Sequence, residues 1–298
     1  MTAGGLGALA GLAAELCDLK RIRDARGPDS VATRLFRRAW AALAAGEDPE
    51  EIALGTVADA LAACRLGGID QEVMTRAHMD GAAAMDVLQR SFDEVAGPVE
   101  PTLRTRLRGT LGQGTEYGDA PAFAEALIRQ PRAGATCPGK PRIVLEPPEM
   151  HGEHCLVVAV LAVCAAPRFG AEPVPAFLAG LAHHLHNATL PDSGFAGEML
   201  LGEHLQPLME RLFARELDTL PPALSGEVRA ALNAIVDASA PVGQAFHAAD
   251  VMDRVLEMRH FDRVARFRVE QALDDMDLVH AGPTQAFHQT VLREAGLP

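Results

Sequence analysis

Residues 152–187 read GEHCLVVAVLAVCAAPRFGAEPVPAFLAGLAHHLHN, and this stretch decides the fold class. The apolar residues after His154 predict a buried helix, and the Pro/Gly-marked segment around Gly170 predicts a loop. A second apolar stretch predicts another helix, which ends at the adjacent pair His183 and His184. Imidazoles on two apolar helices are typical of a metal site built inside a helical bundle.

The rest of the 298-residue chain is also patterned as helix, and the alternation typical of strands is scarce. Capping residues and Gly or Pro stops set the expected helix ends. We therefore predict an all-α protein. Four helices are expected most clearly. The first begins at Pro28–Ser30 and ends at Ala45, the second spans Asp48 to Leu66, the third spans Asp70 to Val95, and the fourth runs from Asp119 to about Gln130.

Residues 131–149 contain seven Pro or Gly residues and interrupt the helical pattern. Such a stretch is typical of a junction between structural units. We expect an N-terminal helical region over residues 1–135 and a C-terminal helical domain over residues 136–298.

Composition excludes several classes of function. The net charge of −13 argues against a groove for a nucleic-acid polymer, which needs clustered Lys and Arg. The apolar run 156–166 is shorter than the roughly 20 residues of a membrane span. The apolar start of the chain, residues 1–16, lacks the basic residues of a secretion signal, and the five cysteines form no CxxC pair. We therefore expect a cytoplasmic protein with reduced thiols and no membrane partner.

A third apolar helix is expected around Asp250, within the sequence HAADVMDR of residues 247–254. One His in an apolar helix is usually a core residue, but three imidazoles and a carboxylate in this order favour a metal site. Nitrogen donors with one carboxylate suit zinc, iron, manganese or cobalt better than magnesium.

Three short motifs, Glu153–Cys155, Leu181–His184 and Ala248–Asp250, follow one another along the chain. They resemble the E-H-S, L-L-H-D and A-A-D motifs of HD-domain metal-dependent phosphohydrolases, in the helical group that includes the bacterial 5'-deoxynucleotidases. The resemblance covers residues 142–262 and implies an HD-domain-like helical bundle. The resemblance does not extend to residues 1–130.

The resemblance implies that His154, His183 and Asp250 are metal ligands, with His184 in place of the aspartate of the family's H-D pair. Three His and one Asp around a divalent ion carry a net charge of +1, whereas the family's set of two His and two Asp is neutral. This change favours a softer metal and an anionic substrate. Loss of the metal is the alternative outcome of the same change.

Other positions depart from the family in similar ways. Asn187 stands where the deoxynucleotidases carry a Glu thought to activate water, and Asp192 stands where they carry a further acidic residue. Arg142 matches an Arg that faces the substrate phosphate in the family. A solvated Arg in a linker would give the same sequence pattern. His247 stands where the family often has a substrate-contacting Lys, and a helix surface residue would also fit. We expect His184, His247 and Asp192 as catalytic residues, and Arg142 with His247 to bind substrate.

These expectations describe a hydrolase that acts on a small phosphorylated metabolite or nucleotide and uses one divalent Mn, Co, Zn or Fe ion. Two alternatives follow from the same residues. An HD-type iron-dependent oxygenase or lyase would add His ligands such as His204, and a degenerate HD domain would bind a partner without catalysis. The expected partner is an anionic small molecule, and helical domains of this kind often form homodimers.

Overall fold

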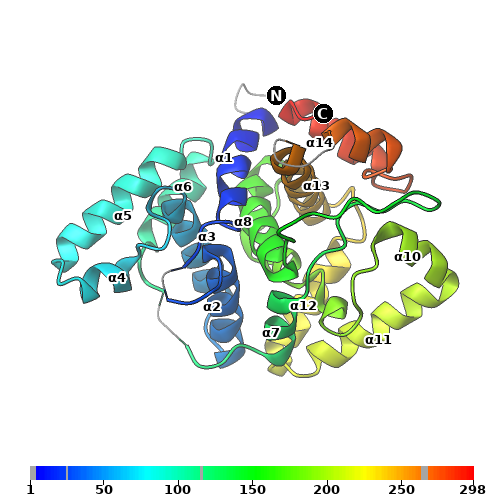
Figure 1. Ribbon diagram of the computed structural model, residues 1–298. Coiled ribbons are helices and arrows are strands. Elements are labelled where there is room, and N and C mark those ends of the chain that lie inside the picture. Colours follow the sequence, from blue (N-terminus) through cyan, green and yellow to red (C-terminus); the bar gives the residue numbers. More distant parts are fainter. Residues whose placement is uncertain (1–4, 25, 115–116, 263–267) are drawn as a thin grey trace.

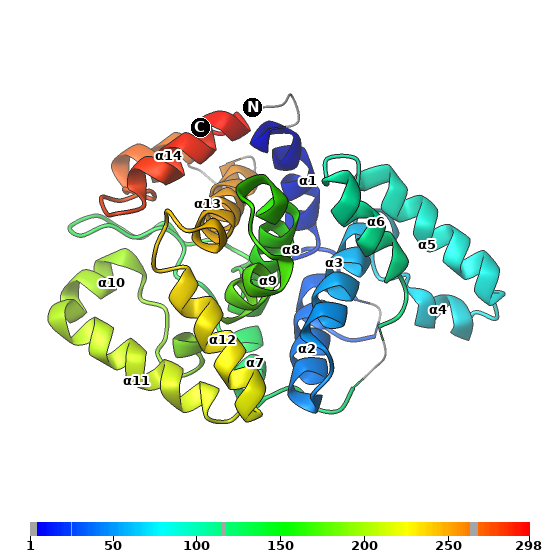
Figure 2. The same ribbon diagram turned by 180° about the vertical axis from the view of Figure 1, so that it is seen from behind.

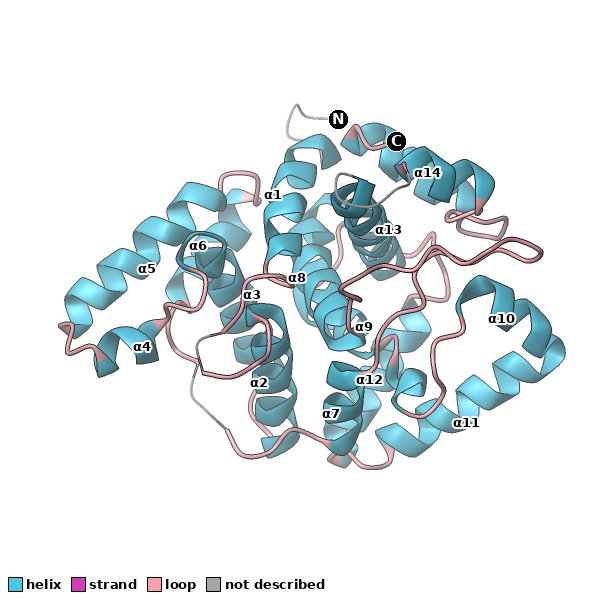
Figure 3. Cartoon of the chain, viewed as in Figure 1, coloured by secondary structure: helices cyan, strands magenta, loops and turns pink. Residues whose placement is uncertain are grey.

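The computed structural model describes residues 5–24, 26–114, 117–262 and 268–298. Within these residues the chain forms fourteen α-helices and no strand (Figure 3), which confirms the all-α class. The start of the N-terminal stretch, residues 1–4, lies outside the described residues. The helices are α1 (Leu6–Asp18), α2 (Val31–Ala45), α3 (Pro49–Leu66), α4 (Gln71–Arg76), α5 (Gly81–Val95), α6 (Pro101–Gly109), α7 (Ala122–Arg129), α8 (His151–Phe169), α9 (Pro173–Ala182), α10 (Gly194–Leu201), α11 (Leu205–Leu217), α12 (Pro222–Ala234), α13 (Pro241–Asp262) and α14 (Gln285–Ala295).

Helix α8 lies at the centre of the molecule, with α13 and α9 against it (Figures 1 and 2). Its residues from His151 to Ala166 are all buried, because helices cover it on every side. By length and mean hydropathy it is the one described helix that could cross a membrane, and 83% of that apolar window is buried within the molecule. Its apolar surface is therefore accounted for by packing inside the bundle.

The contact between α8 and α9 depends on a glycine. A Cβ built on Gly180 would lie 2.4 Å from the Cα of Ala159, so the two helix backbones meet where no side chain intervenes. This close approach holds the end of α9 against α8, and the next residues along the chain are His183 and His184.

Local capping explains the helix starts that the sequence predicts. The Ser30 hydroxyl accepts a hydrogen bond from the backbone of Thr33 and begins α2, and the Asp48 carboxylate accepts one from Glu50 and begins α3. The predicted ends at Ala45 and Leu66 are confirmed, each followed by a glycine with positive φ.

The single helix expected from Asp70 to Val95 is wrong. The chain forms α4 and α5 with a turn between them, and His78 in that turn has φ of 59°. The Asp80 carboxylate accepts hydrogen bonds from the backbone N–H groups of Ala82 and Ala83, so it caps a new helix instead of continuing the old one.

The Pro-rich stretch 131–149 is irregular, as expected. Its two ends pair through a backbone hydrogen bond from Arg132 to Glu149, and an isolated bridge joins Ala135 and Ile143. It does not separate two cores. Helix α1 packs against α8, α13 and α14, and α2 packs against α8. Buried residues from both expected regions form one hydrophobic cluster, so the N-terminal helices help to build the surroundings of α8.

Candidate metal centre

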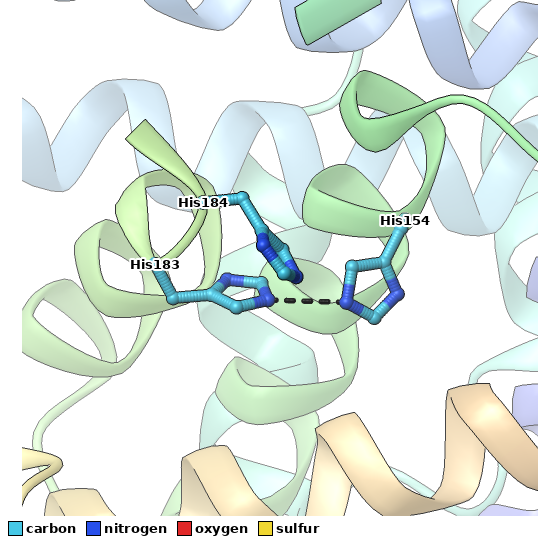
Figure 4. A group of neighbouring side chains, drawn as sticks. All are labelled: His154, His183 and His184. Atoms are coloured by element: carbon cyan, nitrogen blue, oxygen red, sulfur yellow. Dashed lines mark hydrogen bonds between the residues drawn. The ribbon is translucent and has the colours of Figure 1, made fainter. Parts of the chain in front are cut away.

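Three helices bring the expected metal ligands together. His154 lies in the first turn of α8, His183 and His184 follow the end of α9, and Asp250 lies on α13. The Nε2 atoms of His154 and His183 are 3.1 Å apart, and the first of these lies 3.3 Å from Oδ1 of Asp250. One ring nitrogen from each of the three imidazoles lies within 4.8 Å of the others, and the rings converge in Figure 4.

Hydrogen bonds at the far side of two rings fix which nitrogen carries the proton. Nδ1 of His183 lies 2.8 Å from the carbonyl oxygen of Gly180, which can only accept, so Nδ1 donates. Nδ1 of His154 lies 2.6 Å from the carboxylate of Asp253, which is fully buried on α13. In the neutral form of each ring, Nε2 is then a free lone pair that faces the other ring.

His184 is oriented in the same way through Asn187. The side-chain amide of Asn187 donates to the carbonyl oxygen of Leu190 at 3.0 Å, which turns its Oδ1 toward His184. Nδ1 of His184 donates to that oxygen at 2.7 Å and leaves Nε2 without a proton. The resemblance implies a water-activating Glu at position 187. The structure instead shows Asn187 as a group that orients the His184 imidazole.

A metal ion fits between the rings. Burial lowers the pKa of His183 to about 3, and burial together with His183 itself holds the pKa of His184 well below its usual range. The Nε2 atoms of His183 and His154 face each other across 3.1 Å. Ligand nitrogens bound to one ion at 2.0–2.1 Å lie about 2.9–3.4 Å apart in octahedral or tetrahedral geometry, so these residues fit a transition metal.

Asp250 supplies the negative charge. Burial would raise the pKa of this carboxyl. In the metal-free protein, a hydrogen bond donated by a protonated Nε2 of His154 and the nearby guanidinium of Arg254 outweigh burial and hold the pKa well below its usual range. Nη1 of Arg254 lies 3.7 Å from Oδ2 of Asp250, one helical turn away. The carboxylate is therefore ionised and ready to bind a cation.

Three of the four expected ligands lie in the wall of a cavity of about 510 Å³, and His154 is the exception. Two guanidinium groups, those of Arg132 and Arg254, line it beside the expected ligands His183, His184 and Asp250. Carboxylates line it as well. Of these, Glu149 and Glu257 are paired with the buried Lys20, whereas Glu198 has no such partner among the described ion pairs. The cavity thus combines a donor set for a metal with cationic and hydrogen-bonding groups for a polar ligand.

The other expected site residues are placed differently. His247 lines the cavity, and its Nε2 lies 2.8 Å from the carbonyl oxygen of Ile235. Asp192 also lines it, but both carboxylate oxygens accept backbone N–H groups, from Ala133 and Gly194, so it anchors the loop. His204 is exposed in a short 3-10 turn outside the cavity.

Arg142 is exposed, and the structure does not bring it to the cavity. Its guanidinium donates to the carbonyl oxygens of Ala133 and Ser193 at 3.3 and 3.1 Å, which ties two loops together. Arg132, ten residues earlier in the same Pro-rich stretch, lines the cavity instead and pairs with Glu149 at 3.3 Å. Sequence reasoning missed Arg132, because nothing in the local pattern distinguishes the two arginines.

Asp253 was missed too, although a signal was present. It lies three residues after Asp250, which places the two carboxylates on the same face of α13. Lys20, which contacts Asp253, gives no comparable signal because it lies 233 residues away in the sequence.

No protein-family model matches this chain, and neither do the curated proteins or the solved structures that were searched. The case for a metal centre therefore depends on the geometry of these side chains.

Substitution of Asn187 tests the orientation of His184. Asn187→Ala removes the acceptor of the Nδ1 proton, and we expect a loss of about 10–100-fold in metal affinity, as for other groups that hold a ligand imidazole. Asn187→Asp keeps an acceptor oxygen and should retain most of the affinity. Competition with a chromophoric chelator measures both variants, and equal affinities would show that Asn187 does not orient the ligand.

Proposed function

We propose that this protein is a metal-dependent hydrolase of the HD type that acts on a small phosphorylated metabolite. The observation that carries the proposal is the convergence of three Nε2 lone pairs and the Asp250 carboxylate at a cavity that also presents two guanidinium groups. The order of the ligands along the chain, and their resemblance to the HD motifs, supports the same reaction class.

His154, His183, His184 and Asp250 would hold the metal. A divalent transition ion bound there would polarise a phosphoryl oxygen and lower the pKa of a coordinated water. Burial keeps the His183 and His184 imidazoles neutral. Hydrogen bonds at Nδ1 orient all three rings, so that binding the ion requires little rearrangement of the ligands.

Arg132 and Arg254 are the groups suited to the phosphate. A guanidinium presents paired N–H donors that match two phosphate oxygens. Both line the cavity beside the ligands, and Arg254 also faces Asp250. With a divalent ion, three neutral imidazoles and one carboxylate, the centre has a net charge of +1, which adds to the attraction for an anion.

The remaining wall supplies groups for the rest of the substrate. Burial lowers the pKa of His288 to about 4, so its imidazole is neutral at pH 7. Its Nε2 has no hydrogen-bond partner among the described residues. Together with Glu198 and His247, it offers hydrogen bonds to hydroxyl or amino groups of a small metabolite.

Phosphate release from a panel of phosphomonoesters, with the protein loaded separately with manganese, cobalt and zinc, tests the reaction class. We expect turnover of at least one ester and a loss of at least about 100-fold in Asp250→Asn, because the variant removes the ligand charge that offsets the ion. No phosphate release with any of these metals would contradict the proposal, and iron-dependent oxygen uptake would favour the oxygenase instead.

A matched pair of arginine variants locates the phosphate in the same assay. Arg254→Met removes a guanidinium from the cavity wall and should raise KM about tenfold or more, since a charged hydrogen bond to phosphate is lost. Arg142→Met removes a guanidinium outside the cavity and should leave KM within about threefold. The reverse result would favour the role that the resemblance implies for Arg142.

A further inference from the structure

Next to the metal centre, the chain buries a cation of its own. Lys20 follows the end of α1, and its side chain is only 2% exposed. Its ammonium contacts three carboxylates, those of Glu149, Asp253 and Glu257, the second at 2.6 Å and the third at 3.4 Å. All three are at most 4% exposed. A buried cation held by three buried anions is costly to assemble and calls for an explanation.

One of the three carboxylates is the group that orients His154. Asp253 accepts the Nδ1 proton of His154 through one oxygen, while its other oxygen contacts Lys20. The Cys17 thiol also donates to the oxygen that contacts Lys20, at 3.3 Å. Without the ammonium, only His154 and this weak donor would hold Asp253 in position.

The place that the ammonium takes resembles a second metal site. Donor atoms of Glu149, His154 and Asp253 lie within 4.8 Å of one another, and His154 belongs to both this group and the group with His183 and His184. The ammonium already contacts two of the three residues. A metal ion bound by these carboxylates would have to displace the ammonium from buried surroundings.

We propose that Lys20 is a positioning residue whose ammonium takes the place of a second cation: it holds Asp253 as the partner of His154 and limits the centre to one metal ion. The proposal rests on the metal centre described above, but not on the hydrolase reaction. It also gives the N-terminal region a role in the site, because α1 packs against α13 and carries Lys20 to Asp253.

Chemical rescue tests the proposal. Lys20→Ala removes three carbon atoms and the ammonium, which n-propylammonium replaces atom for atom. A cavity of about 170 Å³ lined by Lys20, Glu149 and Glu257 gives the amine a place to bind. We expect one cobalt ion per wild-type chain, an affinity about 10–100-fold lower in Lys20→Ala, and recovery of at least about tenfold with the amine. The visible absorption spectrum of bound cobalt should change in the variant and return with the amine.

Three further variants separate positioning from folding. Arg21→Ala is the control, because Arg21 is also a cation, lies next to Lys20 in the sequence, and pairs with Glu257 but not with Asp253. This variant should bind cobalt with the affinity of the wild type. Asp253→Asn should lose affinity without recovery by the amine. Lys20→Met combined with Glu257→Gln removes one charge of each sign, which spares the fold, and should still lose affinity.

Several results would overturn the proposal. Wild-type affinity and spectrum in Lys20→Ala or in the double variant would show that the ammonium does not position the ligand. A loss that the amine leaves unchanged would mean that Lys20 acts only on the fold, and two cobalt ions in the wild-type chain would show that it does not take the place of an ion. A chain that binds one ion and follows the expected pattern, but releases no phosphate, would refute the hydrolase and leave this proposal standing.

Discussion

His183→Ala should reduce bound metal from about one ion per chain to less than about a tenth, with a loss of affinity of more than about 100-fold. The variant removes one of four donors, and even groups that merely orient a ligand contribute about 10–100-fold. It also removes the ring that faces His154 at 3.1 Å, so that only two imidazoles and Asp250 remain to hold the ion. Metal analysis of protein purified without chelator, followed by competition titration, measures both quantities.

His186→Ala is the matched control. His186 is also a buried imidazole, its pKa is lowered by burial to about 4, and its ring packs against Phe213 at a centroid distance of 5.0 Å. It does not belong to the group of converging donors. Both variants delete a buried imidazole, but only His183→Ala should lose the metal. A His183→Ala protein that keeps one tightly bound ion would refute the ligand assignment.

Gly180→Ala should destabilise the metal-free protein by about 1–3 kcal/mol or more, because the added methyl group has no space between two helix backbones. Its Cβ would lie 2.4 Å from the Cα of Ala159, and only movement of α9 away from α8 relieves the clash. The same movement shifts the Gly180 carbonyl that orients His183, so metal affinity should fall together with stability. Urea unfolding and metal titration measure the two effects.

Gly226→Ala is the control for the intrinsic effect of replacing a helical glycine. Gly226 lies on the exposed face of α12, and a Cβ there meets no atom within 4 Å. This variant should be more stable by about 0.5–1 kcal/mol, since alanine restricts the unfolded chain. If Gly180→Ala proved as stable as the wild type, the close helix contact would not hold the donors in place.

The parts of the fold that depend on local signals could be predicted from the sequence. The starts of α2 and α3 follow from Ser30 and Asp48, which cap the helices through neighbouring backbone groups. The break between α4 and α5 escaped prediction because Asp70 and Asp80 are both competent caps, and the residues between them still carry a helical pattern. The structure uses both caps, Asp70 for α4 and Asp80 for α5, and a pattern of apolar residues does not record where the first helix ends.

The candidate site divides in the same way. His154, His183, His184 and Asp250 could be found because ordered motifs mark them, and the structure brings all four together. The residues that contact these ligands or line the cavity beside them could not all be predicted from sequence spacing. The contact of Lys20 with Asp253 joins residues 233 positions apart, and the presence of Arg132 rather than Arg142 in the cavity depends on the path of an irregular loop.

X-ray absorption spectroscopy of the protein loaded with one equivalent of zinc tests the assignment of the four ligands. We predict three imidazole nitrogens at about 2.0–2.1 Å, at least one oxygen and no sulfur around a single ion. Sulfur is not expected, because no cysteine among the described residues belongs to the group of converging donors. A coordination shell of oxygen alone, or one that contains sulfur, would refute this ligand assignment.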